Sequence, residues 1–130
     1  MQKLYFSSVR TFLRLIALIT FSALCLGGIG QAFAHAHPET QSPLAGAVVS
    51  APQEVRITYD EALEPAFSSL IVSNAQGKQI NSAKAEVDST THKTMHVPLP
   101  TLPTGVYHVK WVAVADDGHR TQGTYTFTVK

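Results

Sequence analysis

The feature that most constrains the fold is the alternation of apolar and polar residues in short runs. Apolar residues take every second position in EVRITYD (54–60), in the first part of GVYHVKWVAVAD (105–116), and in TYTFTVK (124–130). A period of two places alternate side chains on one face of a β-strand. In residues 54–60 this face would carry Val55, Ile57 and Tyr59. No run after residue 35 has a convincing helical period of 3.6 residues.

Two further runs, SLIVSN (69–74) and KTMHVPL (93–99), are short, apolar and rich in β-branched residues. The turn-like Asn74-Ala75-Gln76-Gly77 and the proline-rich segment 98–105 separate the runs. Short strands at this spacing predict an all-β fold, an antiparallel β-sandwich or barrel of about seven strands. We expect Trp111 and its aromatic neighbours to lie in its core.

The first 34 residues have the pattern of an export signal. Their only charges are positive, on Lys3, Arg10 and Arg14, and the strongly apolar part, residues 15–26, is too short for the ~20 residues that span a bilayer. Ala32-Phe33-Ala34 is a small-x-small cleavage site. We predict cleavage after Ala34, which leaves one domain, residues 35–130, in the periplasm and not embedded in the membrane. The alternative is an uncleaved membrane anchor.

Removal of this segment would change the cysteine content and the net charge of the chain. Cys25 is the only cysteine, and Leu24 before it does not suit a lipoprotein signal. The mature chain would therefore have no disulfide and no thiolate metal site. The full chain has a formal net charge of +1 and would lose three positive charges, so residues 35–130 carry −2. This charge argues against a nucleic-acid-binding protein.

The predicted new N-terminus reads His35-Ala36-His37. An N-terminal histidine offers its α-amine and its imidazole to one metal ion, and the two nitrogens close a small chelate ring. The α-amine has a reference pKa of about 7.7–8.0, so it loses its proton readily to a bound metal.

A second candidate lies in Asp117-Gly118-His119. Side chains two residues apart in an extended loop can project the same way, and Gly118 lets the backbone turn. Together with His35, this loop would supply three nitrogens and one oxygen, a tetragonal set that Cu(II) favours. Zinc would accept the same ligands in a tetrahedral arrangement. The alternative is a plain hairpin turn, since Asp-Gly is common in such turns.

Three stretches together resemble the CopC family of periplasmic copper-binding proteins: the His35-Ala36-His37 start, SPLAGAVVSAPQEVRITYDEALEP (42–65) and LPTGVYHVKWVAVADDGHRTQGTYTFTV (102–129). The resemblance implies a seven-stranded Greek-key β-barrel with immunoglobulin-like or cupredoxin-like topology. It implies one Cu(II) per chain, bound by His35, Asp117 and His119. Glu61 would orient a ligand by a hydrogen bond, and His37 would be a supporting or exposed residue. A CopD-type inner-membrane protein would be the partner, in copper uptake or resistance.

The mature chain departs from relatives that also hold Cu(I) through a methionine-rich segment. It has one methionine, Met95, and one thioether is not such a segment. We therefore predict a protein that binds only Cu(II). His92, His96 and His108 are expected to be surface or strand residues.

Three alternatives to this site stay open. The amine of His35, two deprotonated amides and the imidazole of His37 could chelate Cu(II) without the loop. The N-terminal histidine and a second histidine also resemble the copper brace of oxidative polysaccharide-cleaving enzymes, although Asp117 would fill the position that oxygen needs, so we expect no enzyme. A metal-free immunoglobulin-like interaction module would not need His35 at all.

Overall fold

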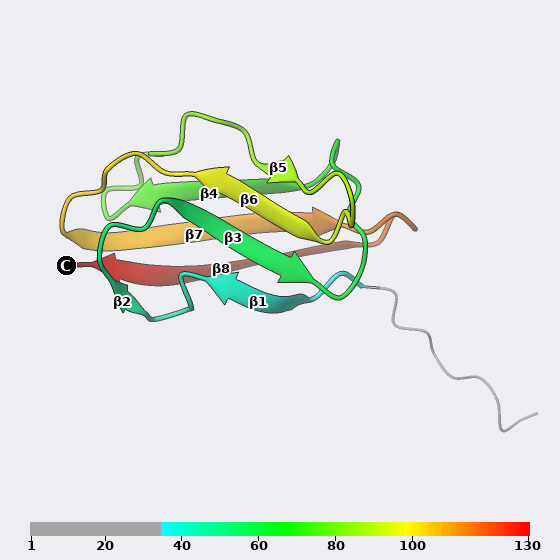
Figure 1. The fold of residues 1–130 in the computed structure, drawn as a ribbon, viewed down its shortest axis with the longest axis horizontal. Helices are drawn as coiled ribbons and strands as arrows, with labels where there is room; N and C mark the ends of the chain where they lie inside the picture. The colour runs from blue at the N-terminus through cyan, green and yellow to red at the C-terminus, as the bar shows by residue number, and fades with distance from the viewer. Residues whose placement is uncertain (1–34) are drawn as a thin grey trace, which may run out of the picture. The chain divides into compact units, whose positions relative to one another are not determined.

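The computed structural model describes residues 35–130, so the predicted export signal lies outside the described part. These residues form eight β-strands (Figure 1). They are β1 (Pro38–Ser42), β2 (Val48–Val49), β3 (Glu54–Tyr59), β4 (Ser69–Asn74), β5 (Glu86–Val87), β6 (Thr94–Pro98), β7 (Gly105–Val114) and β8 (Arg120–Val129). Residues 35–130 hold no helix that could cross a membrane.

The strands make two four-stranded sheets, with the orders β1-β3-β6-β5 and β2-β8-β7-β4. All pairs are antiparallel except β2 with β8. The chain crosses from the first sheet to the second after β1, after β3 and after β6, as in Greek-key sandwiches. The predicted all-β fold is confirmed. The described part has eight strands, not about seven, and two of them, β2 and β5, are only two residues long.

The core lies between the two sheets and is built from the alternating faces that the sequence indicates. On β3, Val55, Ile57 and Tyr59 are fully buried. On β7, Trp111 is buried as predicted, and its ring meets the ring of Tyr59 edge-on at a centroid distance of 5.7 Å. Each fully buried large apolar side chain contributes roughly 1.5–3 kcal/mol to folding, so these faces hold the two sheets together.

The β7–β8 hairpin is the longest pairing and runs from Gly105 opposite Val129 to Val114 opposite Arg120. Strand β8 begins four residues earlier than predicted, because the strand continues through Gly123. A Cβ atom at Gly123 would lie 2.5 Å from Cζ2 of Trp111, so the indole occupies the space that a side chain would need.

The loop between β3 and β4 lies against the loop between β7 and β8. Leu63 and Ala115 form a β-bridge. The N–H of Glu64 donates to the carbonyl of Val114 at 2.7 Å, and the N–H of Asp116 donates to that of Ala62 at 3.2 Å. These contacts bring residues 60–64 to the end of the domain that carries the Asp117–His119 loop.

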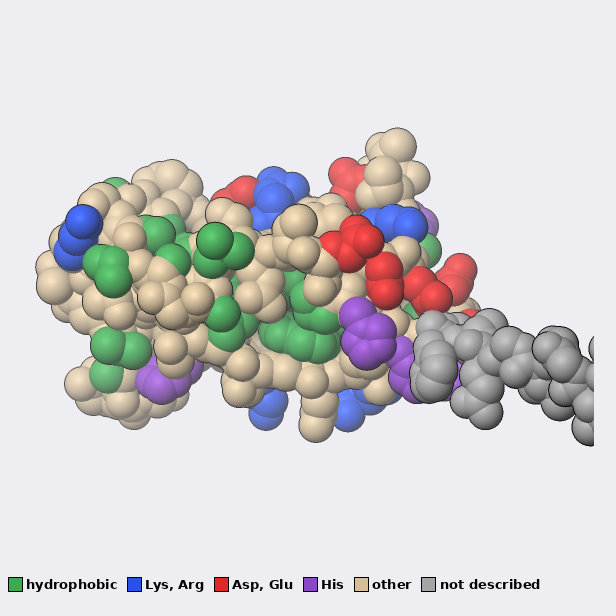
Figure 2. All heavy atoms as spheres, turned by 90° about the horizontal axis from the view of Figure 1, so that it is seen from below, with side chains coloured by type: hydrophobic (Ala, Val, Ile, Leu, Met, Phe, Trp, Pro, Cys, Tyr) green, Lys and Arg blue, Asp and Glu red, His purple; other side chains and the backbone are tan. Residues whose placement is uncertain are grey.

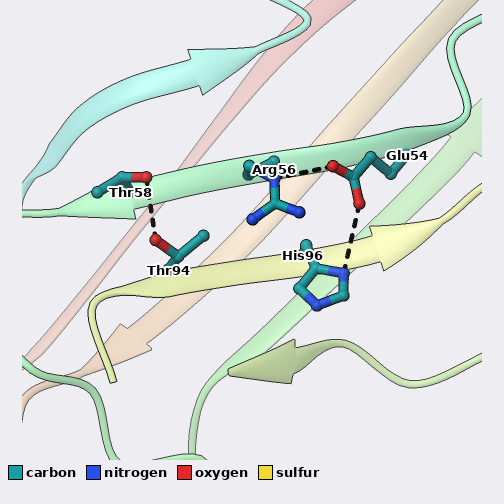
Figure 3. A network of polar contacts seen from close by, with 5 residues as sticks. All are labelled: Glu54, Arg56, Thr58, Thr94 and His96. Atoms are coloured by element: carbon teal, nitrogen blue, oxygen red, sulfur yellow. Dashed lines mark hydrogen bonds and ion pairs between the residues drawn. The ribbon is translucent and has the colours of Figure 1, made fainter. Parts of the chain in front are cut away.

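The other three histidines lie on strands or at the surface, as predicted. His92 is in an exposed turn, and His108 is exposed on β7. His96 on β6 is half-buried, and its Nδ1 lies 3.5 Å from Glu54 (Figure 3). Glu54 starts β3 whereas Tyr59 ends it, so this cluster is about 17 Å along the strand from the loop end.

Candidate metal centre

The loop that carries Asp117 and His119 is a tight turn that closes the β7–β8 hairpin. The N–H of Gly118 donates to the carbonyl of Ala115 at 2.9 Å, and the N–H of Ala115 donates to that of His119 at 2.8 Å. Gly118 has a φ of +88°, a left-handed conformation that glycine adopts without a steric penalty. The candidate ligands Asp117 and His119 are therefore themselves residues of this turn.

The side chains of Asp117 and His119 project together, as their spacing predicts. One carboxylate oxygen of Asp117 accepts the backbone N–H of His119 at 3.0 Å, and the other lies 2.9 Å from Nδ1 of the His119 ring. The backbone bond first, and then the ring, hold the pKa of Asp117 below its usual value. Asp117 is therefore a carboxylate at neutral pH. For both side chains to bind one ion, the bond between them must be exchanged for bonds to the metal.

His35 lies beside this pair, although it comes from the other end of the domain sequence. Its ring centroid is 5.0 Å from that of His119, with the rings tilted by 44°. The ring of His37 also stacks on the ring of His35, at a centroid distance of 6.1 Å. Metal–nitrogen bonds in proteins are about 2.0–2.1 Å, so imidazoles at this separation can reach a shared ion after small movements.

The segment before β1 is fixed by two residues that the sequence analysis did not single out. Ala36 is fully buried, and its carbonyl accepts the hydroxyl of Thr121 at 2.6 Å. The N–H of His37 donates to a carboxylate oxygen of Asp60 at 2.7 Å, and the N–H of Asp60 donates back to the carbonyl of His37 at 3.1 Å. Only two signals of these contacts are present in the sequence: a polar residue directly after β3, and a threonine two residues after His119.

Glu61 follows Asp60 and is half-buried at the same end of the domain. The hydrogen bonds to the His37 backbone come from Asp60, one residue before the position that the resemblance indicated. Orientation of a ligand by Glu61 stays a prediction.

Within residues 35–130, no three His, Cys, Asp or Glu side chains already stand together as a metal site. Among the three predicted ligands, the contacts are pairwise, His35 with His119 and His119 with Asp117. One predicted donor, the α-amine of His35, belongs to a peptide bond in the 130-residue chain and becomes an amine only when the chain is cut before His35. The remaining donors fit a copper ion by type, with imidazole nitrogens and one carboxylate.

The surroundings of these histidines are acidic. Figure 2 shows histidine side chains next to a group of Asp and Glu side chains on one face of the domain. The contacts described above bring Asp60, Glu61 and Glu64 to the same end as Asp116 and Asp117. A cluster of negative charge lowers the electrostatic energy of an approaching cation.

Known proteins are similar to this chain in sequence and in fold. A family model for the CopC domain matches residues 38–130. The chain is 37% identical over 120 residues to copper resistance protein C of Escherichia coli, with 83% of this chain and 95% of the relative covered. It is 34% identical over 126 residues to protein YobA of Escherichia coli strain K12, with 95% of this chain and 98% of YobA covered.

Solved structures agree. CopC from Methylosinus trichosporium OB3b superposes with a TM-score of 0.69 at 31% identity, over 74% of this chain and 94% of that one. PcoC, a methionine-rich copper resistance protein from Escherichia coli, superposes with a TM-score of 0.63 at 32% identity, over 75% of this chain and 100% of that one. The chain therefore belongs to the CopC family of copper-handling proteins.

Proposed function

We propose that the mature protein binds one Cu(II) per chain and serves as a carrier or buffer of copper in the periplasm. The ligands would be the α-amine and imidazole of His35, the carboxylate of Asp117 and the imidazole of His119. The observation that carries this proposal is the 5.0 Å approach of the His35 ring to the His119 ring, which itself contacts Asp117. Three nitrogens and one oxygen in a tetragonal arrangement suit Cu(II).

The single methionine of residues 35–130 supports the preference for Cu(II). Met95 is fully buried between the two sheets, where its thioether packs in the apolar core. Its side chain has no exposed surface from which to bind an ion. Soft Cu(I) would find no thioether at the proposed site, in contrast to what the name of methionine-rich PcoC implies for that relative.

The rest of the proposal follows from the resemblance and from the export signal. The protein would capture Cu(II) after export and hand it to a CopD-type inner-membrane protein, in copper import, tolerance or supply. It would not be an enzyme, because Asp117 would fill the position at which oxygen binds in a copper oxidase. Absence of copper-dependent peroxide production with a reductant would support this part.

The decisive experiment uses protein that has been expressed with its export signal, with the N-terminus verified by intact mass. Cu(II) is titrated into wild type, His119→Ala and His108→Ala, and EPR spectra are recorded. His108 is the matched control, an exposed histidine on β7 near the other end of the hairpin. We expect one tight equivalent with three-nitrogen coupling, weakened and altered only in His119→Ala.

Two other results would count against the proposal. A four-nitrogen spectrum that His119→Ala leaves unchanged would mean that His35-Ala36-His37 chelates copper alone. Full binding by a protein whose chain still begins before His35 would mean that the α-amine is not a ligand.

A further inference from the structure

We propose that Asp60 and Thr121 are positioning residues that decide which of two coordination modes Cu(II) adopts. They do so by holding the peptide group between Ala36 and His37 at both of its polar atoms. The inference rests on the proposed function, because it concerns how copper is steered to His35, Asp117 and His119.

Two modes compete for Cu(II) at a His-Ala-His N-terminus. In the loop mode, His35 binds together with Asp117 and His119. In the tail mode, the amine of His35, the deprotonated backbone nitrogens of Ala36 and His37, and the His37 imidazole surround the ion in a plane. The tail mode uses neighbouring residues only, so it needs no folded domain. A folded protein reaches the loop mode only if something disfavours the tail mode.

The peptide group between Ala36 and His37 makes hydrogen bonds that bear on the competition between the two modes. Its carbonyl oxygen accepts the Thr121 hydroxyl at 2.6 Å, and its N–H donates to Asp60 at 2.7 Å. The N–H of Asp60 returns a bond to the next carbonyl, that of His37, at 3.1 Å. This peptide is therefore held between the start of β8 and the end of β3.

This arrangement opposes the tail mode in two ways. Loss of the amide proton would leave a negative nitrogen 2.7 Å from the Asp60 carboxylate, and like charges this close repel strongly. Ala36 is also fully buried, so its backbone would have to leave the interior to wrap around an ion. The loop mode requires neither change, because it leaves the amides of Ala36 and His37 protonated.

The two anchors are themselves attached to the rigid part of the domain. Asp60 follows Tyr59, which is fully buried, and the Asp60 carbonyl accepts the ammonium group of Lys93 at 2.7 Å. Thr121 lies on β8 opposite Ala113, two residues after His119. The same strand start thus carries a proposed ligand and an anchor, so holding Ala36 also sets the place of His35 relative to His119.

The test compares Cu(II) EPR and visible spectra at one equivalent for processed wild type, Asp60→Ala, Thr121→Val and the double variant. We expect three-nitrogen coupling in wild type. The variants should gain a four-nitrogen component with absorption at higher energy, and this component should persist when His119→Ala is added. Loss of a group that orients a metal ligand typically weakens binding ~10- to 100-fold, and the loop mode should lose affinity in that range. Thr121→Ser should keep the wild-type spectrum, because it retains the hydroxyl. Asp60→Asn retains the accepting oxygen but not the charge, so it should show a smaller four-nitrogen component than Asp60→Ala.

Asp88→Ala is the matched control. Asp88 also accepts backbone N–H groups, from Thr90 at 3.1 Å and Thr91 at 2.7 Å, but these lie in its own turn at the same end of the domain, and it makes no hydrogen bond to the Ala36–His37 peptide. Its loss should lower stability and leave the copper spectrum unchanged. Thr121→Val nearly conserves side-chain volume and tests the inference independently if Asp60→Ala folds poorly, with folding checked by circular dichroism.

A three-nitrogen spectrum in every variant, with unchanged affinity, would overturn the inference while the proposed function stands. A four-nitrogen spectrum already present in wild type, and insensitive to His119→Ala, would refute the proposed function itself. An altered spectrum in Asp88→Ala as well would show that general loosening, and not these two anchors, selects the mode.

Discussion

Substitution of Gly123 by alanine should destabilise the domain through a clash with the single tryptophan. A Cβ atom at this position would lie 2.5 Å from Cζ2 and 2.8 Å from Cε2 of Trp111, distances that real Cβ atoms do not adopt. The indole is the side chain that must move, but it is 92% buried and packs on Tyr59. Relief of the clash therefore disturbs the core.

The magnitude follows from a comparison with Gly105, which begins β7 and has no atom within 4 Å of its virtual Cβ. Both changes reduce the flexibility of the unfolded chain equally, by ~0.5–1 kcal/mol in favour of folding. Gly123→Ala alone adds the cost of overpacking, about 1–3 kcal/mol. The difference between the two variants isolates that cost. For a domain of this size, each kcal/mol corresponds to a shift of about 4–8 °C in Tm.

The assay is thermal and guanidinium unfolding of Gly123→Ala and Gly105→Ala, monitored by the fluorescence of Trp111. We expect Gly123→Ala to unfold well before wild type, and Gly105→Ala to match or exceed wild type. A change in the near-ultraviolet circular dichroism of Gly123→Ala would report the moved indole. Equal stability of the two variants would refute the packing argument.

Four further predictions concern stability and copper binding. Within residues 35–130 the buried hydroxyl of Tyr59 has no hydrogen-bond partner, so Tyr59→Phe should raise the free energy of unfolding by ~1 kcal/mol in guanidinium titrations; a loss would reveal a partner such as water. Cu(II) at 1,000 times its Kd should stabilise the processed protein by about 4.1 kcal/mol in calorimetry; a chelator should abolish this gain, and His119→Ala should reduce it. His96→Ala should leave the Cu(II) titration unchanged, because His96 lies outside the proposed site. Weaker binding in this variant would instead place the site at the Glu54 cluster. Hydrogen bonds from Thr91 lower the pKa of Asp88, so its stabilising effect should be present above pH 3.8 and be lost as pH falls through the lower folded-state value; acid unfolding curves of Asp88→Asn should lack this loss.

The parts of the fold that the sequence predicts are those with a strong local pattern. Alternation indicated β3 and β7 and their buried faces within a residue or two. Strand β1 was missed, because PETQS has no apolar alternation and is ordered by its pairing with β3. The start of β8 was missed because a glycine usually weakens a strand. Gly123 is needed there because the Trp111 ring, across the hairpin, occupies the space of a side chain. Two-residue strands such as β2 carry no period at all.

The same division holds for the candidate site. The spacing of Asp117 and His119 and the turn at Gly118 could be read locally, and the structure has both side chains on one side of the loop. The approach of His35 to His119 was proposed from their donor types and from the family resemblance, since no local pattern joins the two ends of the domain. Asp60 was not predicted because its role depends on the position of the His37 backbone, which only tertiary structure determines.

The bond between Thr121 and Ala36 has a consequence for the timing of copper capture. The two residues are 85 positions apart in sequence, and closing a loop of that length costs about 4 kcal/mol of chain entropy. The ends therefore meet only when the intervening strands have folded. A chain still emerging from the export machinery would have its first histidine but not the strand that completes the loop site. Copper capture through the loop site would then be confined to finished molecules.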